Sequence, residues 1–401
     1  MPHRRSHLFG TSRSSFSNIR DQITFRDHLP VVPIEVCVEH KPWGNEKYHP
    51  IPGESPPSSP FRLENVLAAS SIESIQEAGK LVFHAAGDTG GIKRPESQRI
   101  VADKMEEDFR RPDRSSSPSF FFILGDVVYY HGERSEYYPQ FYEPYLHYPA
   151  PIFAIPGNHD GDPNPRNPLS SSLDGFLENF CAPSPVRTPD AGDSSRTAMT
   201  QPNPYWVLDG PWIRVIGLYT NVPEGGEVHE LQKEWFCEEL KRAPEDKPLV
   251  LTLHHPIYSA DAHHGGSLAM ERLLFWAVER SGKFPDLVLT GHVHNYQRFT
   301  LSKEGRQIPV IVAGAGGYWY LHNMAPALRG IQGPVGIEGR KDLVLESYCE
   351  DRHGFLRLEV SSPEIVCEYF TVPRPHESWK ASPLLWDSFR LDRKTRKLSY
   401  I

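Results

Sequence analysis

Short runs of apolar residues recur along the chain from Lys80 onward, and each has the length of one β-strand. Their hydrophobicity is continuous rather than alternating, which is typical of strands that are covered on both faces. Five of these runs end in a turn with polar side chains of the kinds that bind metals, over residues 81–91, 119–129, 151–160, 249–256 and 286–294. The pattern therefore predicts buried strands with candidate metal-binding side chains at their carboxyl ends.

Stretches with helical character separate these runs. Helices are expected over residues 62–78, 96–110, 135–148, 170–180, 228–240 and 267–280. In the fifth of them, Leu231, Trp235 and Leu240 form an apolar stripe at helical spacing, which we interpret as core. Strands that alternate with helices predict a largely parallel α/β sheet with right-handed crossovers. Because ligands bind outside the carboxyl ends of such strands, the five turns are expected to line one cleft.

Later apolar runs complete the predicted fold. Those at 309–318, 341–349, 355–360 and 365–372 are expected to be antiparallel and to form a second sheet. The expected fold class is a layered α/β sandwich with two mixed β-sheets flanked by helices. Residues 61–372 form the expected domain, with the motifs between 80 and 320. A polar N-terminal tail (1–60) with a short strand over 31–38 and a proline-serine linker (50–60) would precede it, and a C-terminal tail (373–401) would follow.

Composition narrows the class of protein. The 401 residues are 38% hydrophobic and 11% aromatic, which is enough for a sizeable core. No run approaches the roughly 18 consecutive apolar residues of a membrane helix, and the first residues lack the apolar region of a secretory signal. The five cysteines are scattered and never form a CxxC pair, which argues against a disulfide framework and a zinc knuckle. We therefore expect a cytoplasmic protein, with an organellar transit peptide as the alternative.

Charge bears on the partners. The formal net charge is -8, and no long basic stripe is present, so nucleic acid is not an expected partner. No membrane association is expected, and the sequence indicates no protein partner. Histidine is the unusual residue: there are 19, and several stand beside glycine, aspartate or asparagine.

The five turns together offer a set of oxygen and imidazole donors: Asp88, Asp126, Tyr129, Asn158, His254, His292 and His294. Donors of this kind without a thiolate suit iron, manganese or catalytic zinc. Seven are too many for one catalytic metal with an open position, but they suit two, which need a bridging carboxylate. Each turn alone is weak, because aspartate after glycine at a strand end is usually turn chemistry. Five such turns in order predict a binuclear site.

These turns form an ordered set of short motifs: GD-x-G (87–90), GD-x-x-Y (125–129), GNH-D (157–160), H-x-P (254–256) and GH-x-H (291–294). The set resembles the calcineurin-like metallophosphoesterases and, within them, the purple acid phosphatase branch. The usual Asp-x-His opening is absent, since Thr89 and Gly90 follow Asp88. The purple acid phosphatases also lack that histidine and use the tyrosine of GD-x-x-Y, where Tyr129 stands. The absent histidine and the tyrosine at position 129 are thus two departures from the wider pattern that compensate one another.

The resemblance implies a role for each motif residue. The first metal would be bound by Asp88, Tyr129 and His294, the second by Asn158, His254 and His292, and Asp126 would bridge them. His159 would contact the phosphate or protonate its leaving group, and Asn158 and His292 would also face the substrate. Independently of the resemblance, Asn221 follows another strand, and His263 and His264 lie in a loop after the fourth motif strand. These three are rim candidates, for which a solvated loop is the alternative.

The expected function is hydrolysis of a small phosphomonoester, with a metal-bound hydroxide attacking in line and no covalent enzyme intermediate. Two metal ions per chain are expected, either iron with iron, zinc or manganese, or two divalent ions (manganese or zinc). One alternative is a phosphodiesterase or nucleotide-directed hydrolase on the same site. The other is a non-catalytic interaction module, against which the intact set of seven donors argues.

Overall fold

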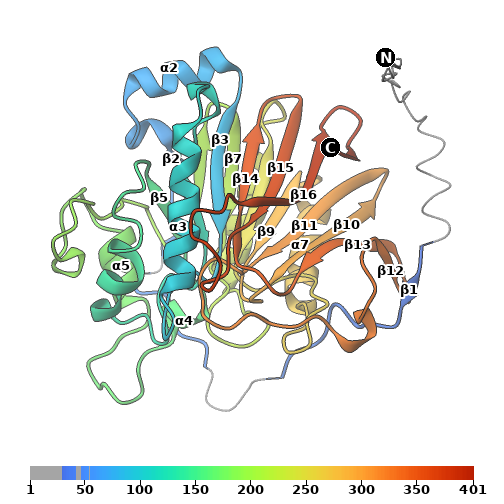
Figure 1. Cartoon of the computed structure of the whole chain (residues 1–401), viewed down its shortest axis with the longest axis horizontal. Coiled ribbons are helices and arrows are strands. Elements are labelled where there is room, and N and C mark those ends of the chain that lie inside the picture. The colour runs from blue at the N-terminus through green and yellow to red at the C-terminus, as the bar shows by residue number, and fades with distance from the viewer. Residues whose placement is uncertain (1–28, 42–46, 54) are drawn as a thin grey trace, which may run out of the picture.

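The computed structural model describes residues 29–41, 47–53 and 55–401. Its strands form two mixed sheets flanked by helices (Figure 1), so the expected fold class is confirmed. The larger sheet has ten strands in the spatial order β1 (Val31–Val32), β12 (Val335–Ile337), β13 (Arg340–Cys349), β10 (Tyr296–Lys303), β11 (Arg306–Ala313), β9 (Leu287–Thr290), β8 (Leu249–Leu253), β7 (Ile213–Gly217), β6 (Trp206–Gly210) and β2 (Phe61–Arg62).

The smaller sheet has seven strands in the spatial order β17 (Lys397–Tyr400), β16 (Leu384–Asp392), β15 (Glu364–Thr371), β14 (Gly354–Val360), β3 (Leu81–Ala86), β4 (Phe121–Leu124) and β5 (Ile152–Ile155). The motif strands β3, β4 and β5 are parallel here, and β8 and β9 are parallel in the larger sheet. The five motif strands are therefore divided between two sheets, where the sequence suggested one.

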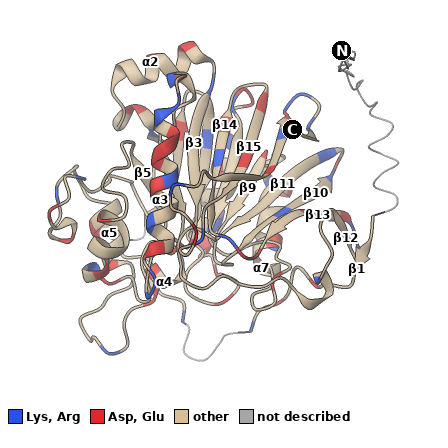
Figure 2. Ribbon diagram, viewed as in Figure 1, with Lys and Arg blue, Asp and Glu red and all other residues tan. Residues whose placement is uncertain are grey.

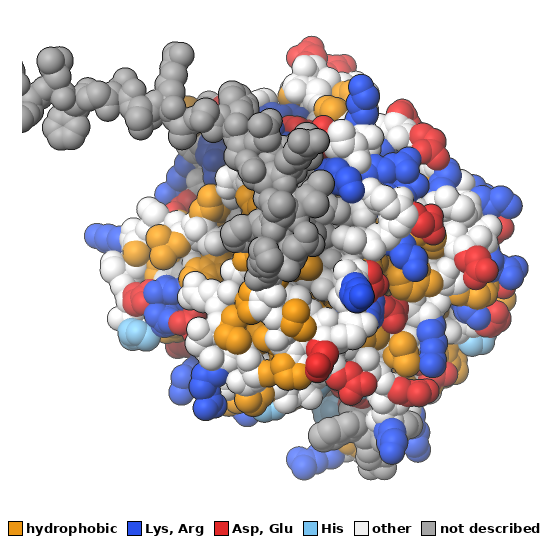
Figure 3. Space-filling view, turned by 90° about the vertical axis from the view of Figure 1, so that its right-hand side faces the viewer, with side chains coloured by type: hydrophobic (Ala, Val, Ile, Leu, Met, Phe, Trp, Pro, Cys, Tyr) orange, Lys and Arg blue, Asp and Glu red, His pale blue; other side chains and the backbone are white. Residues whose placement is uncertain are grey.

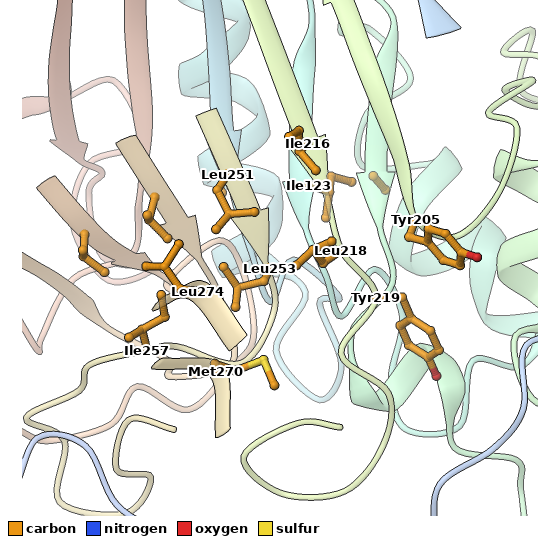
Figure 4. Close-up of a cluster of buried hydrophobic side chains, with 14 of the residues drawn as sticks. Ile123, Tyr205, Ile216, Leu218, Tyr219, Leu251, Leu253, Ile257, Met270 and Leu274 are labelled. Atoms are coloured by element: carbon orange, nitrogen blue, oxygen red, sulfur yellow. The ribbon is translucent and has the colours of Figure 1, made fainter. Parts of the chain in front are cut away.

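The continuous hydrophobicity of the motif strands reflects burial on both faces. Along β4, Phe122 packs in the layer between the sheets with Phe83 of β3 and Val250 of β8, whereas Ile123 points to the outer layer. Neighbouring strand residues point to opposite faces. A strand of a sheet that is covered on both faces therefore needs apolar residues at every position. Figure 4 shows Leu253 of β8 and Leu274 of helix α7 (Leu268–Ser281) in the same cluster of buried side chains as Ile123.

The α-helices of the described residues are α2 (Ala69–Ala78), α3 (Glu96–Glu107), α4 (Asn158–Gly161), α5 (Asp174–Phe180), α6 (Glu230–Arg242) and α7 (Leu268–Ser281). The hydroxyl of Ser267 caps the start of α7, and Gly282 in the left-handed conformation ends it. Figure 2 shows charged residues along α3 and in loops, while the strands consist mostly of uncharged residues. Among the described residues, no helix combines the length and apolarity needed to cross a membrane.

One expected helix did not form. Residues 135–148 fold instead into a short 3-10 turn, a π-helical segment at Tyr138–Tyr142 and further turns. Pro139 and Pro144 lie in this stretch, and proline lacks the N–H that a regular α-helix requires. The expected helix over 62–78 also begins later, at Ala69.

Both terminal segments contribute to the sheets, which differs from the expected tails. Part of the N-terminal segment packs on the fold: β1 pairs with β12, and Val36 and Ile51 are buried. At the other end, β16 pairs with β15 and buries Phe389 and Leu391. Phe389 and Leu391 stand at i and i+2 and therefore share one face of β16. Burial of this face is enough to pair the strand with the sheet.

Candidate metal centre

The five motifs meet where the two sheets present their carboxyl ends. Asp88 follows β3, Asp126 follows β4, Asn158 opens the short helix α4 after β5, His254 follows β8, and His292 follows β9. Parallel strands of both sheets thus deliver their end loops to one place. The arrangement brings together side chains separated by up to about 200 residues in the chain, such as Asp88 and His292.

Three of these residues adopt a backbone conformation that side chains rarely take. The φ angles of Asp88, Asp126 and His292 are 57°, 52° and 67°. Non-glycine residues are uncommon in this left-handed region, and such outliers gather at functional sites, where the surrounding structure holds them.

One group of donors consists of Asp88, Tyr129 and His294. The Tyr129 hydroxyl lies 3.2 Å from Asp88 Oδ1 and 3.3 Å from His294 Nε2. His294 Nε2 in turn lies 3.4 Å from the same carboxylate oxygen. Three donor atoms of different kinds therefore face one point.

The other group consists of Asn158, His254 and His292. The amide oxygen of Asn158 lies 3.1 Å from His254 Nε2 and 3.1 Å from His292 Nδ1. Asp126 lies between the groups: its Oδ1 is 3.5 Å from His254 Nε2. Asp88, Asp126 and His254 each offer a ligand atom within 4.8 Å of the others.

Each of the three histidines holds its second ring nitrogen away from the donor group. His254 Nδ1 lies 2.9 Å from the backbone oxygen of Leu124, and His294 Nδ1 lies 3.1 Å from that of Tyr320. For His292 the outer nitrogen is Nε2, which lies 3.3 Å from a carboxylate oxygen of Glu224. A ring nitrogen that donates to such an acceptor carries the proton, so the inward nitrogen keeps its lone pair for a metal.

Two buried carboxylates make the site electrostatically unfavourable without a cation. Asp88 and Asp126 are only 0% and 1% exposed. Burial raises the pKa of Asp88 to about 7. Burial also acts to raise the pKa of Asp126, but the charges of His254 and His159 outweigh it and lower that pKa. Among the described residues neither carboxylate forms an ion pair with lysine or arginine, and buried charges require a partner.

Glycines leave space for these donors. A Cβ on Gly157 would lie 2.1 Å from Asp126 Oδ1, and one on Gly125 would lie 2.3 Å from His254 Nδ1. At Gly291 and Gly314 it would lie 2.7 Å from Asp88 Oδ2. Such contacts are far below ordinary separations, so these positions allow the close backbone approach that the donor set needs. The crowding, the burial and the donor chemistry all fit a pair of metal ions.

Two residues that support the site were not identified from the sequence. Asp160 accepts hydrogen bonds from the backbone N–H of Gly157 (2.8 Å), Val127 (3.1 Å) and Val128 (3.2 Å), which ties the second motif to the third. Gln140 bonds both the N–H and the carbonyl of Tyr129 at 2.9 Å. Only the spacing of Asp160 within GNHD hinted at a role, and nothing in the sequence singled out Gln140.

His159 stands beside both groups with one nitrogen free. Its backbone N–H donates to Asp126 Oδ1 (3.0 Å), and its Nδ1 lies 2.9 Å from the carbonyl oxygen of Tyr130. Its ring packs on that of Tyr129, with 4.7 Å between centroids. The side chain is half-buried, so Nε2 is the ring nitrogen left for a ligand.

The three rim candidates differ in how close they lie to the donor groups. His264 packs against the His292 ring, with 4.8 Å between centroids, so it lies beside the second group. His263 packs against His322, with 5.2 Å between centroids, and His322 in turn packs against His294 (4.3 Å), so His263 is one ring farther from the donors. The Asn221 amide bonds the backbone of His49 through both its oxygen (2.9 Å) and its nitrogen (2.7 Å), which gives it a structural part in holding the N-terminal segment.

Comparisons with known proteins identify the family to which this chain is similar. The family model described as calcineurin-like phosphoesterase matches residues 81–296. Purple acid phosphatase 21 of Arabidopsis thaliana is 30% identical over 109 residues, which cover 25% of this chain and 23% of that protein. The 3',5'-cyclic adenosine monophosphate phosphodiesterase CpdA of Vibrio vulnificus is 26% identical over 234 residues, 57% of this chain and 72% of that one.

A solved structure extends the likeness to most of the fold. Purple acid phosphatase PPD1 from yellow lupin seeds superposes with a TM-score of 0.54 at 17% identity, covering 78% of this chain and 54% of the lupin chain. This chain thus matches about half the length of the lupin enzyme and about a quarter of the Arabidopsis one. The family match spans more than half of the chain and includes every motif of the site, and the chain belongs to the calcineurin-like phosphoesterase family.

Proposed function

We propose that this chain hydrolyses phosphoric esters at a binuclear metal centre and prefers small phosphomonoesters. The observation that carries the proposal is the pair of donor groups with a buried carboxylate between them. In the proposed assignment Asp88, Tyr129 and His294 hold the first ion, and Asn158, His254 and His292 hold the second, with Asp126 shared. Two such ions, when bound, supply Lewis acidity at the phosphoryl oxygens and lower the pKa of water.

The chain's own residues would orient the ester. With its Nδ1 held by the Tyr130 carbonyl, His159 would present Nε2 to the substrate. From there the imidazole can bond a phosphate oxygen or pass a proton to the leaving oxygen. His264, packed against His292, is proposed as a further contact at the rim, and His263 as a more distant one.

Relatives support both a monoesterase and a second candidate. One relative is a purple acid phosphatase, and another is a cyclic AMP phosphodiesterase that matches more of this chain. The second match favours a phosphodiesterase acting on a small nucleotide as the alternative. The formal net charge of -8 fits a small substrate better than a polymeric one, because a polyanion needs many lysine and arginine contacts. On the face of the molecule in Figure 3, lysine and arginine side chains are interspersed with acidic ones.

An aryl phosphate and its bis-aryl diester separate these two candidates. The monoester dianion carries one more negative charge, and a unit charge pair at 4 Å is worth about 1 kcal/mol even in bulk water. We therefore expect kcat/KM for the monoester to exceed that for the diester by at least about fivefold, with metal-reconstituted protein. A higher kcat/KM for the diester would contradict the monoesterase and support the alternative.

Tyr129 offers a test of the metals. Burial and the carboxylates of Asp126 and Asp88 raise the pKa of this phenol well above its usual value, so it ionises only beside a strongly Lewis-acidic ion. With ferric iron bound to it, the phenolate should give a visible charge-transfer band. We expect iron-loaded protein to be coloured and Tyr129→Phe to lose the band, while Tyr130→Phe keeps it. A colourless protein that is fully active with manganese or zinc would assign two divalent ions instead.

A further inference from the structure

Glu224 occupies a central position outside the motif residues. It lies in the loop that follows β7, and its carboxylate faces three histidines from different parts of the chain. Oε2 lies 3.3 Å from His292 Nε2, and Oε1 lies 3.0 Å from His264 Nδ1 and 3.6 Å from His40 Nδ1. Glu224, His264 and His292 place their ligand atoms within 4.8 Å of one another.

The contact to His292 differs from the corresponding contacts of the other two histidines. His254 and His294 are each oriented through Nδ1 by a neutral backbone carbonyl and face the site with Nε2. His292 has the opposite arrangement: Nδ1 faces Asn158, and Nε2 faces the carboxylate. A neutral imidazole has one N–H, so an anionic acceptor at Nε2 keeps the proton there and leaves the lone pair on Nδ1. A carboxylate also makes the ring a stronger donor than a carbonyl does.

We propose that Glu224 is a positioning residue for the second metal: it fixes the tautomer and the orientation of His292 and holds His264 beside it. The inference rests on the proposed function, since it requires a metal at Asn158, His254 and His292. One carboxylate thereby sets both a ligand histidine and a histidine at the rim.

The N-terminal segment holds this arrangement in place. His40 Nε2 lies 3.1 Å from the Gly266 carbonyl, and its other ring nitrogen lies near Glu224. The Asn221 amide, three residues before Glu224, bonds the backbone of His49. A Cβ on Gly225 would lie 2.4 Å from the His40 ring, so the loop and the segment are closely packed. Residues before the motif core therefore help to place Glu224.

The test is a metal titration of the full chain after removal of its metal by a chelator. Zn²⁺ is added against a competing chelator to wild type, Glu224→Gln, Glu224→Asp and Glu227→Gln. The last is the matched control, because Glu227 is exposed in the same loop and loses the same charge. We expect Glu224→Gln to bind one of two ions about 10–100-fold more weakly and the other unchanged. Glu224→Asp should regain part of the loss, and Glu227→Gln should match wild type.

Other outcomes would overturn the inference. Equal affinities for both ions in wild type and Glu224→Gln would show that the carboxylate does not act on His292. Equal losses of both ions, or a lower melting temperature of the metal-free variant than of Glu227→Gln, would indicate a general structural role. Three ions in wild type and two in the variant would make Glu224 a ligand. A wild type that binds no metal would instead refute the proposed function, so the two failures are distinguishable.

Discussion

Asp126→Asn should remove bound metal and phosphoester hydrolysis together. Asp126 is almost wholly buried and lies between the two donor groups, and it is the proposed ligand shared by both ions. An asparagine has the same shape but is neutral and offers one oxygen. Its oxygen can still accept the N–H of His159, as Asp126 does at 3.0 Å, so the loop should keep its structure.

We expect metal affinity to fall by more than about 100-fold, the upper range for residues that only support a ligand. Elemental analysis after gel filtration and turnover of an aryl phosphate measure the two losses. Asp162→Asn is the matched control: that aspartate lies just beyond the GNHD motif, is 38% exposed and pairs with His131. A folded Asp126→Asn protein with two ions and a near-normal rate would refute the shared-ligand assignment.

His159→Ala should keep both metals and lose turnover, by about 10²–10⁴-fold. The ring is held through Nδ1 and lies against Tyr129, but its side chain is not among the seven donors. Loss of the imidazole should therefore remove a proton donor or a phosphate contact without removing a ligand. The fall should be largest for esters with poor leaving groups, because these depend most on protonation.

A series of aryl and alkyl phosphates measures this dependence. His131→Ala is the matched control, since His131 follows Tyr130, whose carbonyl holds the His159 ring, and bonds Asp162 instead of the site. Equal losses for good and poor leaving groups would leave His159 as a phosphate contact only. Loss of metal together with activity would contradict both roles.

The helices and strands that carry the site follow from local pattern. The apolar runs at 81–86, 121–124, 152–155, 249–253 and 287–290 became fully buried strands, because a strand between layers must be apolar on both faces. The short motifs at their ends predicted the seven donors, since donor type and order depend on the residues themselves. Proline in 135–148 could have warned against a helix there.

The division of the strands between two sheets could not be predicted from the local sequence pattern. Strand β14 pairs antiparallel with β3 and so joins the smaller sheet, whereas β13 pairs with β10 in the larger one. All of these runs look alike in sequence, and their partners are set by which faces pack together. The terminal strands β1, β16 and β17 are short or weakly patterned, and they are stabilised by the sheet edges they join.

By itself, the sequence determined the order and type of the candidate metal ligands and the strand ends at which they stand. Only the tertiary structure decided what orients them. Glu224 lies in a loop, Asp160 in the short helix α4 and Gln140 in the π-helical segment, and no motif marks Glu224 or Gln140. Their roles arise from contacts with residues far away in the chain, such as the 68 positions between Glu224 and His292. Donor chemistry is a property of single side chains, whereas orientation depends on partners that folding alone brings within hydrogen-bonding distance.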